Sequence, residues 1–193
     1  MKKFISFETV RDDALRLAHK ICDEDGFVPD IIYASMRGGA YMANVISEYY
    51  KFKRPDEKPV IFAAVVASSY NNCNRTSELR IDGWTYDPKN IRKGDKIMVV
   101  DDIYDSGNTI SAIVNELLRN GAERKNIKVV VHDYKQFLYG TRPVTAQFPD
   151  YYCNLITINE EKDDEWIHYL SHELVGLTKE ELAIYYGDFD FLN

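Results

Sequence analysis

Three carboxylates and a run of small polar residues stand close together near the middle of the chain. Asp101 and Asp102 end an apolar stretch, residues 97–100, and Asp105 precedes Ser106, Gly107, Asn108 and Thr109. Backbone N–H groups and hydroxyls at the start of a predicted helix suit a phosphate, because the helix dipole also favours an anion there. The paired acids suit sugar hydroxyls or Mg²⁺, which prefers hard oxygen ligands. The stretch therefore predicts a site for a phosphorylated sugar and a metal ion.

An alternation of strands and helices is predicted around this stretch. Apolar residues recur at helical spacing over residues 7–21, with Ser6 placed as a cap. Strands alternating with helices pair in parallel, so the expected fold class is α/β, a doubly wound, mainly parallel sheet flanked by helices. Ligands bind such sheets at the carboxyl ends of the strands. The predicted strands are residues 31–34, 60–67, 96–100 and 127–131, and further helices are expected over 41–49 and 110–118.

A single domain over residues 1–193 is expected, since no repeat, low-complexity tract or linker divides the chain. Its core spans about residues 1–133, and a small hood with the C-terminal segment spans about 134–193. The polar stretches 51–58 and 71–82 are expected to be loops. A strand over 151–158, an acidic run over 160–165 and a capping-box pattern over 178–181 complete the prediction.

Charge and hydropathy exclude several classes of protein. The chain has 24 basic and 31 acidic residues and a net charge of −7, which disfavours a nucleic-acid partner. The longest apolar run, residues 60–67, is far shorter than the roughly 20 residues that cross a bilayer, so no membrane partner is expected. The first ten residues lack the continuous apolar segment of a secretion signal, which favours a cytoplasmic protein. The three cysteines, far apart, indicate neither a disulfide framework nor a zinc site.

Residues 97–109 resemble the phosphoribosyl pyrophosphate (PRPP) motif of the type I phosphoribosyltransferases, two acids followed by a phosphate loop. Asp105 narrows the resemblance to the relatives that act on 6-oxopurines, because orotate and adenine enzymes generally carry Thr or Ala there. The resemblance implies a purine salvage transferase that moves the 5-phosphoribosyl group from PRPP to N9 of hypoxanthine, guanine or xanthine. Pyrophosphate and a nucleoside 5′-monophosphate would be the products, and Mg²⁺ the cofactor.

The resemblance also implies roles for the motif residues. Asp101 and Asp102 would bind the ribose hydroxyls and the metal ion. Asp105 would be the catalytic group, a general base or hydrogen-bond partner at purine N7. The 5′-phosphate would lie against Asp105, Ser106, Gly107, Asn108 and Thr109.

A second loop, Met36, Arg37, Gly38 and Gly39, is similar to the family's pyrophosphate loop. Its two glycines allow a close approach of the backbone. The family's loop carries a non-proline cis peptide, which is therefore expected between Met36 and Arg37.

Three further segments extend the resemblance over about residues 28–173. Ser69 and Tyr70 resemble the Ser-Tyr pair of a flexible loop that closes over the reaction centre and excludes water. Lys135 stands where the family places a lysine that meets purine O6. Trp166 and Ile167 resemble a Trp-Ile pair that stacks over the base and flanks it.

Alternatives remain open at this point. A non-catalytic PRPP-sensing regulator would keep the phosphate loop, and a transferase for another nucleobase would keep the fold. A sugar-phosphate phosphatase or kinase would use Asp101 as its nucleophile, but the accompanying acids and lysines are missing. His168 and His172 have the spacing of a metal-binding pair, but a solvated pair is the favoured interpretation. Relatives form dimers and tetramers, so a homo-oligomer is expected, and the three purines are not ranked.

Overall fold

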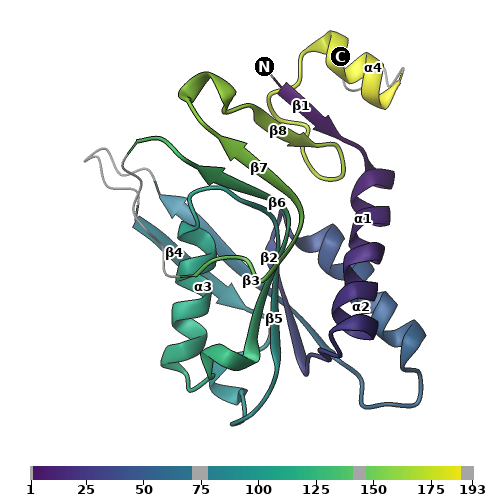
Figure 1. Ribbon diagram of the computed structural model, residues 1–193, viewed down its shortest axis with the longest axis vertical. Coiled ribbons are helices and arrows are strands. Elements are labelled where there is room, and N and C mark those ends of the chain that lie inside the picture. Colours follow the sequence, from purple (N-terminus) through teal and green to yellow (C-terminus); the bar gives the residue numbers. More distant parts are fainter. Residues whose placement is uncertain (1, 71–77, 141–146, 188–193) are drawn as a thin grey trace.

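A six-stranded sheet forms the centre of the computed structural model, which describes residues 2–70, 78–140 and 147–187 (Figure 1). The strand order is β4-β3-β2-β5-β6-β7, and every pair of neighbours is parallel except β3 and β4. The strands are β2 (Ile31–Met36), β3 (Ile61–Tyr70), β4 (Glu78–Trp84), β5 (Ile97–Tyr104), β6 (Ile127–Phe137) and β7 (Tyr151–Ile158). The predicted α/β class with a mainly parallel sheet is confirmed.

Helices cover both faces of this sheet (Figure 1). On one face lie α1 (Phe7–His19) and α2 (Ala40–Lys53), and on the other lies α3 (Asn108–Arg119). The central strands are therefore apolar almost throughout: four successive residues of β2, from Ile31 to Ala34, are buried. Burial on both faces requires a continuous apolar run instead of an alternating one, which is why these strands were readable from the sequence.

The antiparallel edge strand β4 corrects one prediction. Residues 71–82 were expected to be a loop, but residues 78–82 belong to β4, which pairs with β3. The β4 sequence mixes charged, apolar and glycine residues because a strand at a sheet edge is only partly covered. Its polar composition was therefore a poor guide to its structure.

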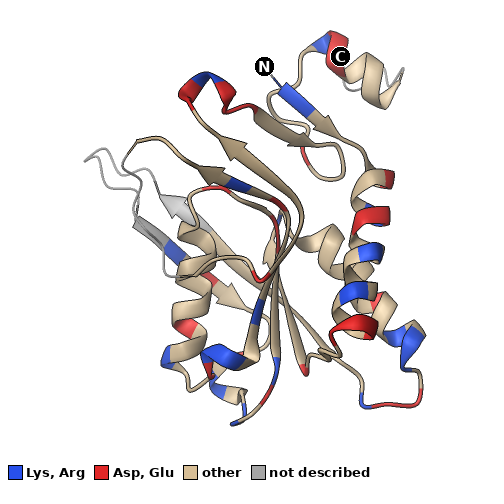
Figure 2. Ribbon diagram, viewed as in Figure 1, with Lys and Arg blue, Asp and Glu red and all other residues tan. Residues whose placement is uncertain are grey.

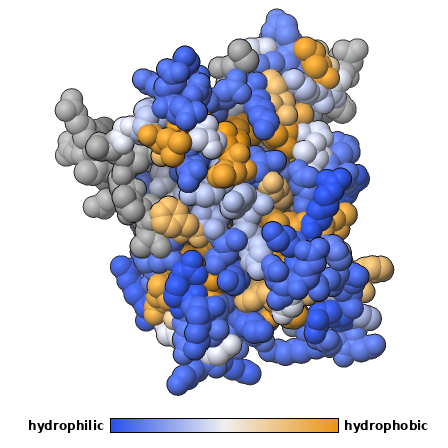
Figure 3. Space-filling model, in the orientation of Figure 1, coloured by the Kyte–Doolittle hydropathy of each residue, from blue (hydrophilic) through white to orange (hydrophobic). Residues whose placement is uncertain are grey.

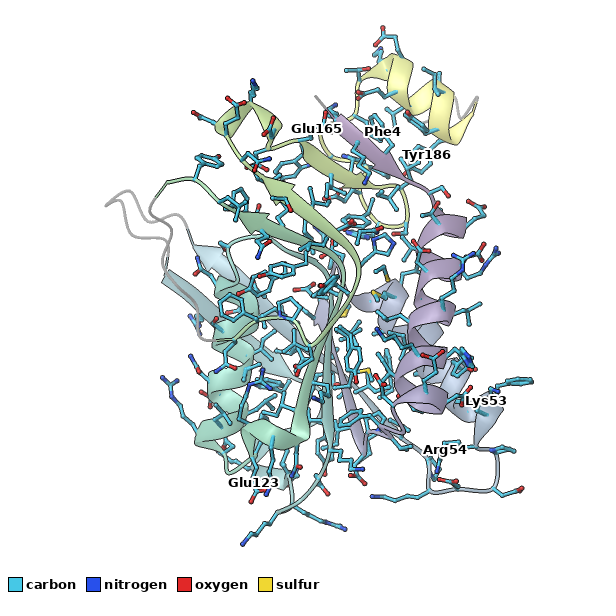
Figure 4. All side chains as sticks on the ribbon, viewed as in Figure 1. Phe4, Lys53, Arg54, Glu123, Glu165 and Tyr186 are labelled. Carbon is cyan, nitrogen blue, oxygen red and sulfur yellow. The ribbon has the colours of Figure 1, made fainter. Side chains whose placement is uncertain are left out.

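A small second sheet, which we call the hood, consists of β1 (Lys2–Ile5) and β8 (Trp166–Tyr169), which are parallel although they come from opposite ends of the chain. It does not coincide with residues 134–193, because β1 comes from the start of the chain and β7 is a strand of the central sheet. The last helix, α4 (Lys179–Tyr186), begins with the predicted capping box at Thr178 and packs on β1 through the ring stack of Phe4 and Tyr185, at 4.3 Å. Figure 4 shows Phe4 and Tyr186 on this part of the molecule.

Charged residues are frequent along α1 and at the tip between β7 and β8 (Figure 2). The visible face is mostly hydrophilic, with small apolar patches between the polar residues (Figure 3). Among residues 2–70, 78–140 and 147–187, no helix has the length and apolar character that crossing a membrane requires.

Candidate functional site

The carboxyl end of β5 places Asp101 and Asp102 side by side. The N–H of Asp102 donates to Asp101 Oδ1 at 3.1 Å, and the N–H of Ile103 donates to Asp102 Oδ1 at 2.8 Å. Burial raises the pKa of Asp101 well above its ordinary value, and the Asp102 carboxylate raises it further. A bound cation would stabilise the charged forms of two adjacent acids held in this way.

The chain then turns sharply from β5 into α3. Gly107 adopts φ 74°, a left-handed conformation that side-chain-bearing residues avoid, and α3 begins at the next residue. The turn brings the N-terminal end of α3 next to the two acids. Because the first N–H groups of a helix have no partner within it, this end of α3 can bind an anion.

A cavity of about 620 Å³ opens over this turn. The end of β2 and its loop, the stretch from Asp101 to Ile110, and a segment after β8 form its walls. Of the predicted site residues, those that line the cavity are Met36, Arg37, Gly38, Asp101, Asp102, Asp105, Ser106, Gly107 and Thr109. The two predicted phosphoribose ligands outside the lining set are Gly39 and Asn108.

The loop from Met36 to Gly39 lies against the two acids and contains the expected cis peptide between Met36 and Arg37. A Cβ atom on Gly38 would lie 2.4 Å from Asp102 Oδ1, and one on Gly39 would lie 2.2 Å from the carbonyl oxygen of Val100. A side chain at Gly39 would push the loop away from the backbone of β5, and one at Gly38 would displace the Asp102 carboxylate. The glycines therefore hold the backbone of this loop against the acids.

The remaining wall consists of residues 172–175, which the sequence analysis did not assign to the site. His172 Nε2 lies 3.2 Å from Asp102 Oδ2, and its ring stacks on Tyr169. The interpretation of His168 and His172 as a solvated pair is wrong: His168 is buried in the hood, and its Nε2 contacts the carbonyl oxygen of Glu173 at 3.0 Å. No local pattern marks His172, because the fold brings it to Asp102 from 70 residues away.

The residues predicted to contact the base lie outside this cavity. Lys135 is only 5% exposed, and its Nζ donates to Asp164 Oδ1 at 2.5 Å and to the carbonyl oxygen of Glu165 at 2.8 Å. Trp166 is 64% exposed, whereas Ile167 is buried in the core. Figure 4 shows Glu165 at the hood end of the molecule. The structure thus gathers most of the predicted phosphoribose ligands around one cavity but does not bring the predicted base ligands to it.

The predicted flexible loop lies partly outside the described residues. Ser69 and Tyr70 end strand β3, opposite Leu79 and Glu78, but their side chains and residues 71–77 are not among those the structure describes. The prediction for this loop stays a prediction.

The acids suit a divalent cation that arrives with a phosphorylated ligand. Within the described part of the chain, no group of three or more His, Cys, Asp or Glu side chains forms a metal site. Mg²⁺ is commonly bound by one or two carboxylates together with substrate phosphates and water, so a complete protein cage is not required. The adjacent carboxyl groups of Asp101 and Asp102 fit such an ion.

Comparison with known proteins agrees with the geometry. The model of the phosphoribosyl transferase domain matches residues 7–172. A hypoxanthine/guanine phosphoribosyltransferase of Methanocaldococcus vulcanius is 34% identical over 87 residues, which are 45% of this chain and 39% of that protein. A hypoxanthine/guanine phosphoribosyltransferase of Methanotorris igneus is 46% identical over 41 residues, which are 21% of this chain and 22% of that protein. These alignments therefore span well under half of the curated relatives.

Two solved structures share the fold. A purine phosphoribosyltransferase of Pyrococcus horikoshii superposes with a TM-score of 0.66 at 23% identity, covering 92% of this chain and 98% of the other. A xanthine-guanine-hypoxanthine phosphoribosyltransferase of Helicobacter pylori gives a TM-score of 0.57 at 19% identity, covering 89% and 92%. With a family model that matches most of its length and a cavity built on the acids and turn after β5, the chain belongs to the phosphoribosyl transferase domain family.

Proposed function

We propose that the chain transfers the 5-phosphoribosyl group of PRPP to N9 of a 6-oxopurine base and releases pyrophosphate. The observation that carries the proposal is the single cavity in which the start of α3, the Asp101–Asp102 pair and the Arg37–Gly38 loop meet. These three features match the three parts of PRPP, which are a phosphate monoester, a ribose ring and a diphosphate.

The start of α3 holds the 5′-phosphate in this proposal. Ser106, Gly107 and Thr109 line the cavity there, and the helix dipole favours the doubly charged monoester. Asp101 and Asp102 lie beside this end of the helix and accept hydrogen bonds from the ribose hydroxyls. The sugar is thereby held at both ends, which orients its anomeric carbon.

The loop from Met36 to Gly39 binds the leaving diphosphate. Arg37 is exposed and lines the cavity, so its guanidinium is available to the charge that grows as the C1–O bond breaks. Mg²⁺ held by Asp101 and Asp102 would supply further stabilisation of that charge. Their carboxylates also face the positive charge that develops on the ribose.

Asp105 is the proposed catalytic residue. It is the last residue before the phosphate turn and lines the same cavity. From there its carboxylate accepts the N7 hydrogen of the purine, either as a hydrogen-bond partner or as a base. This interaction raises electron density in the imidazole ring and makes N9 a better nucleophile.

Base recognition is assigned to the hood side. The names of the archaeal relatives favour hypoxanthine and guanine, and Lys135 is suited to a purine O6 atom. An ammonium group has three N–H donors, and among the described residues Lys135 gives two of them to Asp164 and Glu165. The third donor is available to a substrate oxygen once the hood closes on the base, with Trp166 and Ile167 flanking it.

A panel of bases tests the proposed function. Purified protein with Mg²⁺ and PRPP is given hypoxanthine, guanine, xanthine, adenine or orotate, and pyrophosphate release and nucleotide formation are both measured. We expect product with at least one 6-oxopurine and none with adenine or orotate. PRPP binding without product from any base would favour the regulator, and product from adenine or orotate alone would move the chain to another branch of the family.

A further inference from the structure

A buried polar cluster lies directly behind Asp102. It consists of His132 and Asp133 on β6 and Tyr169 on β8, which are 0%, 0% and 2% exposed. The Tyr169 hydroxyl donates to Asp133 Oδ2 at 2.5 Å, and His132 Nδ1 contacts the same oxygen at 2.7 Å. On its far side His132 Nε2 lies 3.2 Å from Asp13 Oδ2, at an angle that makes no hydrogen bond.

The burial of this cluster lowers the stability of the fold. Among the described residues, Asp133 Oδ1 is buried and has no hydrogen-bond partner. Burial raises the pKa of Asp133, but the contacts with His132 and Tyr169 outweigh burial and keep that pKa below its ordinary value. Asp133 is therefore a buried carboxylate whose second oxygen is unsatisfied, an arrangement that native proteins rarely keep without a use.

The cluster reaches Asp102 through Tyr169. The Tyr169 hydroxyl also donates to the carbonyl oxygen of Asp102 at 3.1 Å, so that its single proton is shared between this oxygen and Asp133 Oδ2 in a three-centre hydrogen bond. The Tyr169 ring stacks on His172 with 5.6 Å between centroids and 17° between planes, and His172 Nε2 is 3.2 Å from Asp102 Oδ2. Tyr169 thus supports Asp102 twice, at its backbone through the hydroxyl and at its carboxylate through His172.

The location of Tyr169 gives these contacts their significance. Asp102 belongs to β5 of the central sheet, whereas Tyr169 belongs to β8 of the hood. The hydroxyl is therefore a link between the two sheets, made at the residue that faces the ribose. Asp133 fixes the hydroxyl of Tyr169 and so determines where this link is held.

We propose that Tyr169, held by Asp133, is a positioning residue that sets the placement of Asp102 for PRPP. The inference rests on the proposed function, since it takes Asp102 as a ligand of PRPP. Neither residue touches the substrate. Their effect is confined to the phosphoribose end of the reaction and leaves affinity for the base unchanged.

The experiment compares Tyr169→Phe with Tyr50→Phe. Tyr169→Phe keeps the ring and its stack on His172 and removes only the hydroxyl. Tyr50 is an equally buried tyrosine whose hydroxyl donates to the carbonyl oxygen of Phe27 at 2.7 Å, in the core and away from the cavity lining. Tyr50→Phe loses one buried hydrogen bond and Tyr169→Phe loses the bond that its hydroxyl shares between Asp133 and Asp102, so both should lose thermal stability.

Only Tyr169→Phe should weaken the binding of PRPP. We expect the dissociation constant of PRPP with Mg²⁺, measured by calorimetry, and the KM for PRPP to rise roughly tenfold, with the KM for the base unchanged. Tyr50→Phe should keep wild-type values for both substrates. Equal PRPP binding by the two variants would overturn the proposal, as would an equal rise of both KM values. A wild-type protein that fails to bind PRPP would instead refute the proposed function.

The variant Asp133→Asn tests the same proposal independently, and it can be used if Tyr169→Phe does not fold. The amide has nearly the same shape but no longer offers a charged oxygen to Tyr169. We expect a smaller rise in the PRPP dissociation constant, and no further rise when Asp133→Asn is added to Tyr169→Phe, because both changes act on one contact. Independent, additive effects would contradict the proposed link.

Discussion

The two sides of the candidate site differ in how they are built. The phosphoribose side, residues 36–39 and 101–109, consists of two turns at the ends of adjacent parallel strands, and it surrounds an open cavity. The base side, Lys135 with Trp166 and Ile167, depends on the hood, and Lys135 gives two of its three N–H donors to Asp164 and Glu165. In the proposed function, the first side is already open to its ligand, whereas the second binds the base only after a rearrangement of the hood.

Because of this difference, substitutions on the two sides should change different kinetic parameters. A preorganised site loses little free energy to ordering when its ligand binds, so substitutions on the phosphoribose side should change PRPP affinity and the rate of the chemical step. Changes on the base side should act on the affinity for the purine alone. If variants on both sides changed the affinity for the same substrate, the two sides would not have separate roles.

The largest effect is expected from Asp105→Asn. The amide keeps the shape of the side chain but cannot take up the N7 hydrogen, so kcat should fall by roughly 100-fold or more. PRPP affinity should change little, because the proposed phosphate cradle consists mainly of backbone N–H groups. Steady-state kinetics combined with PRPP calorimetry measures both. A parallel loss of affinity would indicate that Asp105 only shapes the turn.

A somewhat smaller effect is expected from Gly39→Ala. The added Cβ would lie 2.2 Å from the Val100 carbonyl oxygen, so the loop must shift, at a cost of about 1–3 kcal/mol in the free energy of unfolding. PRPP affinity should fall with it. The matched control is Gly83→Ala on β4, where the added Cβ would meet no atom within 4 Å. Wild-type PRPP binding by Gly39→Ala would show that the close approach is unimportant.

The residues of the phosphoribose side could largely be predicted because they lie in short contiguous segments of the sequence. Two contiguous segments carry the acids, the turn glycine and the pyrophosphate loop, and the parallel sheet brings their carboxyl ends together. The cis peptide at Met36–Arg37 was expected from the family resemblance of one of these segments, whereas the approach of Gly38 and Gly39 to Asp102 and Val100 was not among the predictions.

The base side was not predictable in the same way because its contacts join distant parts of the chain. Asp164 meets Lys135 across 29 residues, and β8 pairs with β1 from the other end of the chain. His172 reaches Asp102 only through this pairing. No periodicity within one segment records which strand of a hood meets which, so hydrophobic patterning could not reveal these partners.

On the base side, Lys135→Ala should raise the KM for the 6-oxopurine roughly tenfold and leave the KM for PRPP unchanged, since one charge-assisted hydrogen bond is lost. Lys128→Ala is a matched control on the same strand, at the end remote from β8, where Lys128 pairs with Asp150. An unchanged KM for the base would remove Lys135 from base recognition.

The smallest effect is a gain in stability. Because burial raises the pKa of Asp101, the folded protein disfavours its charged form, and this penalty grows as the pH rises above the ordinary pKa of an aspartate. Asp101→Asn should therefore raise the free energy of unfolding at neutral pH. The gain should vanish below about pH 4, where the wild-type carboxyl is protonated in both states.

Thermal unfolding at several pH values, without PRPP, checks this prediction. The same variant should lose affinity for PRPP, so that stability and binding change in opposite directions. A loss of stability at neutral pH would mean that Asp101 is a structural group and not a ligand residue.

A crystal structure of the protein with PRPP and Mg²⁺ tests the central claim most directly. The account predicts the 5′-phosphate at residues 106–109, the ribose hydroxyls at Asp101 and Asp102, and the diphosphate at Arg37 and Gly38. PRPP bound elsewhere, or bound in this cavity with its monoester away from the start of α3, would contradict it.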